Sequence, residues 1–224
     1  MKKKFFITIL CVCLFVTASV MATMAFLTDK DSVANTFTVG KIDIALDEAD
    51  VDADGKLIVD GQGKPVARVK ENQYHLIPGQ SYIKDPTMTV KKGSDEAYVR
   101  LMVTTNCMKE LDVIFAKHGP LELTDVFGGY DGTKWTYIGK KENATANTMT
   151  YEFRYHEKVK PESGADKVLE PLFTTLMVPG LITKEDLESI KDLEIRVIGH
   201  GIQEATFDTA DKAWEAFELQ YPDN

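Results

Sequence analysis

The stretch Ala97-Tyr98-Val99-Arg100-Leu101-Met102-Val103-Thr104-Thr105 decides the fold class, because two sets of side chains alternate along it. Successive side chains of a β-strand point to opposite faces of its sheet, so this period of two predicts a strand. Val99, Leu101 and Val103 form the more apolar set, and we expect them to face the core. The other set, which begins with Tyr98, is expected on the opposite face.

Further segments of similar character lie on both sides of this strand. The alternation changes phase at Gly40, which is typical of a β-bulge that keeps one face toward the core. The run 172–178 is apolar except for Thr174 and Thr175, which predicts a strand buried on both faces. The predicted strands are 37–39, 42–46, 87–91, 97–105, 134–138, 148–159, 172–178 and 193–202.

Helical spacing is confined to three short segments. The first is 108–116, the second begins after Thr183, and the third is 208–218. Thr183 is the predicted N-cap of the second helix, with Asp186 at its third position, and Asp208 is the predicted cap of the third. The apolar side of the third helix carries Ala213, Trp214 and Phe217.

The balance of elements predicts a mainly β protein, a β-sandwich with two or three short peripheral helices. No composition shift marks an interior boundary, so residues 26–224 are predicted to form a single domain. Turn signals at Asp54-Gly55 and Asp60-Gly61 predict a surface hairpin insertion at about 50–70.

The first 25 residues have the order of a secretion signal. Three lysines at positions 2–4 precede an apolar run, and small residues gather at its end. We expect cleavage between Ala25 and Phe26, with cleavage after Ala22 as an alternative. A second alternative is an uncleaved anchor, because the run approaches the roughly 20 residues that span a bilayer.

Removal of the three signal lysines leaves 23 basic against 35 acidic residues, a formal charge of −12. This charge argues against nucleic acid and anionic membranes as partners, so we expect membrane contact only during export. Of the three cysteines, Cys11 and Cys13 lie in the signal and Cys107 is the one that remains. The mature chain is therefore expected to have no disulfide framework.

Few residues have the spacing of a chemical site. Asp50, Asp52 and Asp54, followed by Gly55, resemble the first half of a calcium loop, but the twelfth position is Gly61. Weak calcium binding and a plain acidic hairpin turn are both open readings. The histidines show no zinc spacing and no nucleophile motif occurs, so we expect no catalytic residue, no bound metal and no other cofactor.

One pattern is more specific. The segment 25–44, AFLTDKDSVANTFTVGKIDI, resembles the signal junction and first strand of the TasA/camelysin family of Gram-positive bacteria. The segment 76–86, LIPGQSYIKDP, resembles the Pro-Gly segment that precedes the second core strand in that family. The chain is also similar to a subgroup described as alternate signal-mediated exported proteins.

This resemblance implies a jelly-roll-like β-sandwich and cleavage by a SipW-type signal peptidase. It implies a secreted protein of the cell wall or the biofilm matrix. Some members of the family form matrix fibres, in which the N-terminal segment of one subunit adds a strand to the next. The expected partners are therefore the signal peptidase and a second copy or a related matrix subunit.

Strand donation also has a physical basis in the residues themselves. Cleavage would free an N-terminus that carries Phe26 and Leu27, followed by the alternating Phe37 and Val39. Such a segment can pair with an open sheet edge, with main-chain hydrogen bonds for affinity and apolar side chains for register. The alternative is that the same segment forms the first strand of its own sandwich.

Three functional hypotheses follow. The leading one is an exported, non-enzymatic structural protein of the cell surface or biofilm matrix that forms fibres through its mature N-terminus. The second is a secreted metalloprotease like camelysin, and the third is a soluble extracellular binding module.

Overall fold

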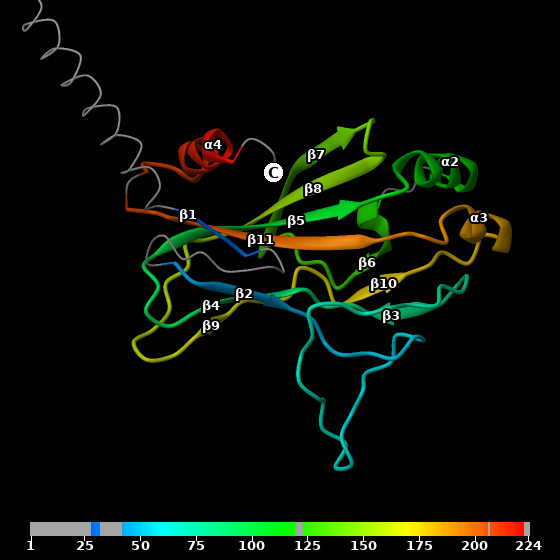
Figure 1. The fold of residues 1–224 in the computed structure, drawn as a ribbon, viewed down its shortest axis with the longest axis horizontal. Helices are drawn as coiled ribbons and strands as arrows, with labels where there is room; N and C mark the ends of the chain where they lie inside the picture. The colour runs from blue at the N-terminus through cyan, green and yellow to red at the C-terminus, as the bar shows by residue number, and fades with distance from the viewer. Residues whose placement is uncertain (1–27, 32–41, 120–122, 206, 222–224) are drawn as a thin grey trace, which may run out of the picture.

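The computed structural model describes residues 28–31, 42–119, 123–205 and 207–221 (Figure 1). The predicted signal and its junction, Ala25 and Phe26, lie outside these residues. Three further residues of the predicted assembly segment, Leu27, Phe37 and Val39, lie outside them as well.

The largest sheet has five antiparallel strands. The predicted strand 97–105 is confirmed as its central strand β5, and Val99, Leu101 and Val103 are buried as expected. Strand β8 also buries its predicted face, although it ends at Tyr155 and not at Val159. The spatial order is β1 (Thr28–Asp31), β11 (Ile195–Gln203), β5 (Ala97–Thr105), β8 (Thr148–Tyr155) and β7 (Trp135–Asn143).

Two smaller antiparallel sheets lie across the core from the first (Figure 1). One contains β2 (Ile44–Asp47), β4 (Thr87–Val90) and β9 (Lys167–Val168). The other contains β3 (Ser81–Ile83), β10 (Thr175–Met177) and β6 (Phe127–Gly128). The prediction of a mainly β fold is confirmed, and the arrangement fits a β-sandwich with short helices.

The core lies between these layers and requires a close approach at Gly199 of β11. A Cβ atom at that position would lie 2.6 Å from Met88 Cε of β4, so glycine leaves the room that the opposite layer occupies. The rings of Phe127 and Phe173 stack with centroids 4.1 Å apart in the same core. The packing thus depends on side chains from both layers.

Three helices among the described residues lie at one end and over the outer face of the large sheet (Figure 1). They are α2 (Met108–His118), α3 (Lys184–Ser189) and α4 (Ala210–Gln220), and a 3-10 turn, η1, spans Leu123–Val126. The capping box of Thr183 and Asp186 is confirmed. The predicted cap of the last helix is wrong by one residue, because Thr209 and not Asp208 accepts a hydrogen bond, from Lys212 N.

The predicted buried strand at 172–178 is also wrong in part. Only Thr175–Met177 is a strand, and Met177 is 47% exposed. Leu172 and Phe173 are fully buried, whereas Thr174 is exposed and donates its N–H to Gly128 O. The apolar composition of this run predicted its burial, but it did not predict that only three residues form a strand.

The segment 50–69 leaves the sandwich as a projecting arm at the bottom of Figure 1. Isolated bridges pair Val51 with Leu57 and Val59 with Pro65, and Glu48 pairs with Val69 at the base. The predicted turns therefore lie between short antiparallel pairings within the arm.

Candidate functional site

Among the described residues, the β11 edge of the five-stranded sheet is paired with β1 along only part of its length. Strand β5 pairs with all nine residues of β11, whereas β1 pairs only from Thr28 opposite Ile202 to Asp31 opposite Gly199. Within the described ranges, no strand pairs with Ile195–Ile198 on the β1 side. A strand edge with unpaired backbone groups is a template for a further strand.

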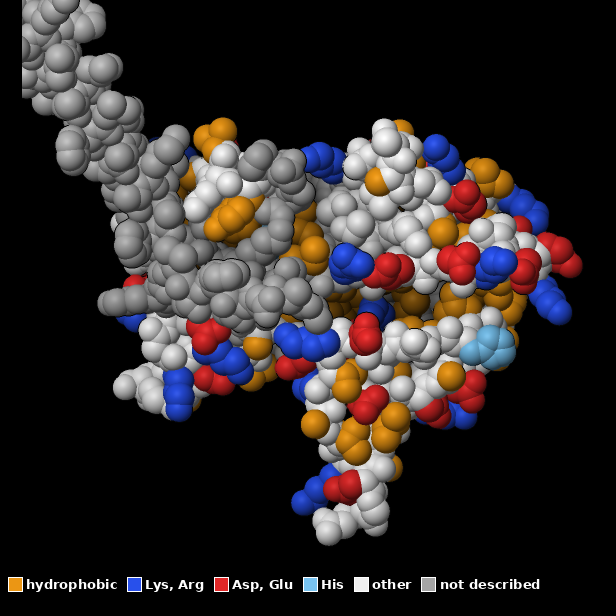
Figure 2. Space-filling model, viewed as in Figure 1, with side chains coloured by type: hydrophobic (Ala, Val, Ile, Leu, Met, Phe, Trp, Pro, Cys, Tyr) orange, Lys and Arg blue, Asp and Glu red, His pale blue; other side chains and the backbone are white. Residues whose placement is uncertain are grey.

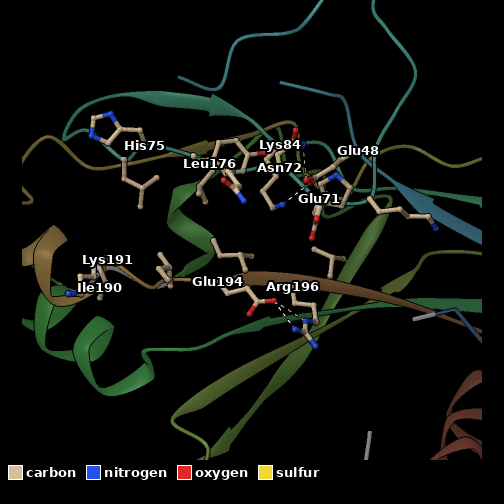
Figure 3. A pocket seen from close by; sticks show the side chains of 18 of the residues that line it. Glu48, Glu71, Asn72, His75, Lys84, Leu176, Ile190, Lys191, Glu194 and Arg196 are labelled. Atoms are coloured by element: carbon tan, nitrogen blue, oxygen red, sulfur yellow. Dashed lines mark hydrogen bonds and ion pairs between the residues drawn. The ribbon is translucent and has the colours of Figure 1, made fainter. Parts of the chain in front are cut away.

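A groove of about 940 Å³ runs beside this half of β11. Ile195–Ile198 form one side of it, the segment 70–76 forms the other, and residues of α3 lie at one end (Figure 3). Figure 2 shows the hollow between the two layers, with hydrophobic side chains inside and charged ones at the rim. The apolar lining includes Leu46, Leu76, Leu176, Leu187, Ile190, Ile195 and Val197.

The charges that line the groove are balanced. Five acidic and five basic side chains contribute, so the groove has no strong preference for a ligand of one sign. An extended peptide that offers main-chain hydrogen bonds and apolar side chains fits this lining better than a small charged molecule does. The charged set is Asp47, Glu48, Glu71, Glu188, Glu194, Lys70, Lys84, Lys184, Lys191 and Arg196.

One wall of the groove holds a polar cluster around the buried side chains of Lys84 and Glu48. Lys84 Nζ lies 2.7 Å from Glu48 Oε2, and Asn72 Nδ2 donates to Glu48 Oε1 at 2.9 Å. Tyr74 donates its phenol hydrogen to Ile83 O, and the Lys84 ammonium lies 5.7 Å from the centre of the Tyr74 ring. Burial of Tyr74, with the Glu48 carboxylate nearby, raises the pKa of the phenol, so it stays a neutral donor.

A second cluster fixes α3 against α2. The Asp186 carboxylate accepts from Thr183 N at 2.9 Å and contacts Lys117 Nζ at 2.9 Å and His118 Nε2 at 2.8 Å. The Thr183 backbone hydrogen bond, followed by those of Lys117 and His118, holds the pKa of Asp186 well below its usual value. This pairing positions α3, so that Leu187 of the helix and Ile190 directly after it lie at the end of the groove.

The outer face of the large sheet contains a buried arginine beneath α4. The Arg100 side chain donates from Nε to His200 Nδ1 at 3.1 Å and pairs with Glu218 of α4 at 2.6 Å. Its guanidinium carbon lies 4.5 Å from the Trp214 ring centre and 4.9 Å from that of Phe217. The sequence placed Arg100 away from the core, and the apolar side of α4 explains its burial.

The three aspartates of the predicted calcium loop lie at the base of the arm. Asp52 Oδ1 accepts from Asp54 N at 3.0 Å and Lys56 N at 2.9 Å, which closes the turn. Asp60 makes the same two contacts with Gln62 N and Lys64 N eight residues later. In the part of the chain that the structure describes, no group of three or more His, Cys, Asp or Glu is arranged to hold a metal, and weak calcium binding at Asp50, Asp52 and Asp54 stays a prediction.

Cys107 is a half-buried free thiol at the start of α2, and burial raises its pKa. No helix among the described residues has both the length and the apolarity to cross a bilayer. No family model, no curated protein and no solved structure matches this chain.

Proposed function

We propose that this chain is an exported structural protein of the cell surface or extracellular matrix, and that it self-associates by strand addition. In this proposal, the N-terminal segment of one copy pairs with the edge of β11 in the next. The observation that carries it is the partial pairing of the β11 edge among the described residues, where β1 ends at Asp31 opposite Gly199 and the groove lies beside Ile195–Ile198.

The register of β1 indicates how much of a donated strand the edge accommodates. Antiparallel pairing of Thr28 with Ile202 and Asp31 with Gly199, continued in the same register, places residue 35 opposite Ile195. A donor segment of eight residues, 28–35, would thus cover the β11 edge from Ile202 to Ile195. Main-chain hydrogen bonds would provide affinity along the strand, and the groove would accept side chains from one face of the donor.

Within one copy, β1 competes with the donor for the same edge. Intramolecular pairing has a high effective concentration, so dilute protein favours the strand of its own chain. Export brings many copies to one surface, which favours exchange between neighbours. Association is therefore expected to depend strongly on concentration.

The test compares the mature chain 26–224 with a variant that lacks 26–36. Light scattering and electron microscopy of the mature chain should show oligomers or filaments that grow with concentration, and the truncated variant should stay monomeric. Filaments that persist unchanged without residues 26–36 would refute strand donation.

A point substitution separates the groove from the donor. Val197→Asp places a carboxylate in the groove beside the β11 edge and should weaken association. Val113→Asp is the matched control, because Val113 is 68% exposed on α2 and does not line the groove. The metalloprotease and the binding module stay predictions, tested by chelator-sensitive casein cleavage and by ligand-dependent hydrogen exchange in the arm.

A further inference from the structure

The wall of the groove brings a half-buried asparagine next to a buried lysine–glutamate pair. Lys84 and Glu48 are only 8% and 6% exposed, and their charged groups are in direct contact. The two oxygens of the Glu48 carboxylate hold different partners, Lys84 Nζ at 2.7 Å and Asn72 Nδ2 at 2.9 Å. One carboxylate therefore connects an amine with a carboxamide (Figure 3).

The Asn72 carboxamide is fixed by the strand-like segment beside it. Val51 N donates to Asn72 Oδ1 at 3.1 Å, and Asn72 Nδ2 donates to Ala49 O at 2.8 Å as well as to Glu48. A backbone N–H on the carbonyl oxygen polarises the carbonyl and stabilises negative charge that develops there. The nitrogen, in turn, faces a group that can deliver a proton to it.

The reaction requires the uncharged forms of the pair, because a protonated amine is not a nucleophile. A buried ion pair is desolvated at a high cost, and its Coulomb attraction often fails to repay this cost. Transfer of one proton from the Lys84 ammonium to Glu48 across their 2.7 Å contact gives a neutral amine and a neutral acid. The neutral amine is the nucleophilic form of lysine.

We propose that Lys84 and Asn72 join in an intramolecular isopeptide bond, with Glu48 as the proton carrier. Lys84 Nζ attacks Asn72 Cγ while Val51 N–H holds the carbonyl oxygen. The Cγ–Nδ2 bond then breaks, and Nδ2 leaves as ammonia with a proton from Glu48. The attacking nitrogen returns its surplus proton to the carboxylate, so the net change is the loss of one ammonia without oxidant or cofactor.

The bond would lock one wall of the groove. It would join the segment 70–76 directly to the turn between β3 and β4, and Glu48 holds both partners beside the base of the arm. A covalent link of this kind resists reducing agents, unlike a disulfide. The inference stands independently of self-association, because it involves residues of one copy only.

Tryptic mass spectrometry of the folded full-length protein tests the bond. Trypsin normally cuts after Lys70, Lys84 and Lys91, but an acylated Lys84 is not a substrate. The expected product is a single peptide 71–91, lighter by one ammonia (about 17 Da), without backbone fragments between residues 72 and 84. Succinimide formation at Asn72 gives the same mass change but leaves Lys84 cleavable, so that outcome counts against the bond.

Three variants assign the roles. Glu48→Gln removes the proton carrier and Lys84→Arg removes the nucleophile but keeps the charge, so both should show complete loss of the light peptide. Lys158→Arg alters an ion pair on the surface and should keep it. Circular dichroism confirms that each variant is folded. Wild-type protein with full mass and a cleavable Lys84 after prolonged incubation would overturn the proposal and leave a simple ion pair.

Discussion

Arg100 should be the most sensitive polar position of the outer sheet face, and Arg100→Ala tests this. The residue is 1% exposed and contacts His200, Glu218, Trp214 and Phe217. Loss of stacking on two buried rings costs about 1–2 kcal/mol. Loss of a charged hydrogen bond costs about 1.5–3 kcal/mol. We therefore expect a loss of about 2.5–5 kcal/mol in the free energy of unfolding.

The assay is urea unfolding followed by circular dichroism, with thermal unfolding alongside it. In a chain of this size each kcal/mol shifts the melting temperature by about 2–4 °C, so a decrease of roughly 5–20 °C is expected. Lys158→Ala is the control, because it removes a solvent-exposed ion pair with Glu204 and should leave the midpoint unchanged. Equal midpoints for Arg100→Ala and Lys158→Ala would refute the view that Arg100 anchors α4.

Two further predictions concern a charge and a turn. The pKa of Asp186 is lowered in the folded state, so the stabilisation by its carboxylate is fully present above the unfolded-state pKa and decreases as the pH falls toward the folded-state pKa. The stability difference between wild type and Asp186→Asn should therefore shrink below about pH 4 in urea titrations at stepped pH. A difference that stays constant with pH would contradict the pairing. Gly55→Ala should lower the melting temperature of the protein more than Gly63→Ala does. Both glycines have a positive φ (74° and 77°), but only a Cβ atom at Gly55 would contact Tyr82, 2.6 Å from Cδ1. Equal effects would show that the Tyr82 contact is relieved without cost.

The local sequence pattern correctly predicted the central strand β5 and the capping box of α3. The alternation of Val99, Leu101 and Val103 was sufficient for β5, because one sheet face meets the core along its whole length. The capping box at Thr183 was likewise predicted from a spacing of three residues. Both features depend on residues close together in sequence.

The features that the sequence did not predict depend on distant contacts. Arg100 looked like an outward-facing residue, and its burial requires α4, which begins 110 positions later. The groove combines segments near residues 46, 72, 84, 176 and 196, and no motif spacing connects them. Glu48, Asn72 and Lys84 show the same limitation, because they meet only after the arm and the turn before β4 have folded.

Binding of a labelled peptide to the open edge tests the central claim most directly. A fluorescein-labelled peptide of residues 26–36, FLTDKDSVANT, is titrated into the folded variant that lacks these residues. The account predicts saturable binding by fluorescence anisotropy, which is weakened by Val197→Asp, preserved in Val113→Asp and absent with a scrambled peptide. Binding that is no stronger than that of the scrambled peptide would contradict strand addition at β11.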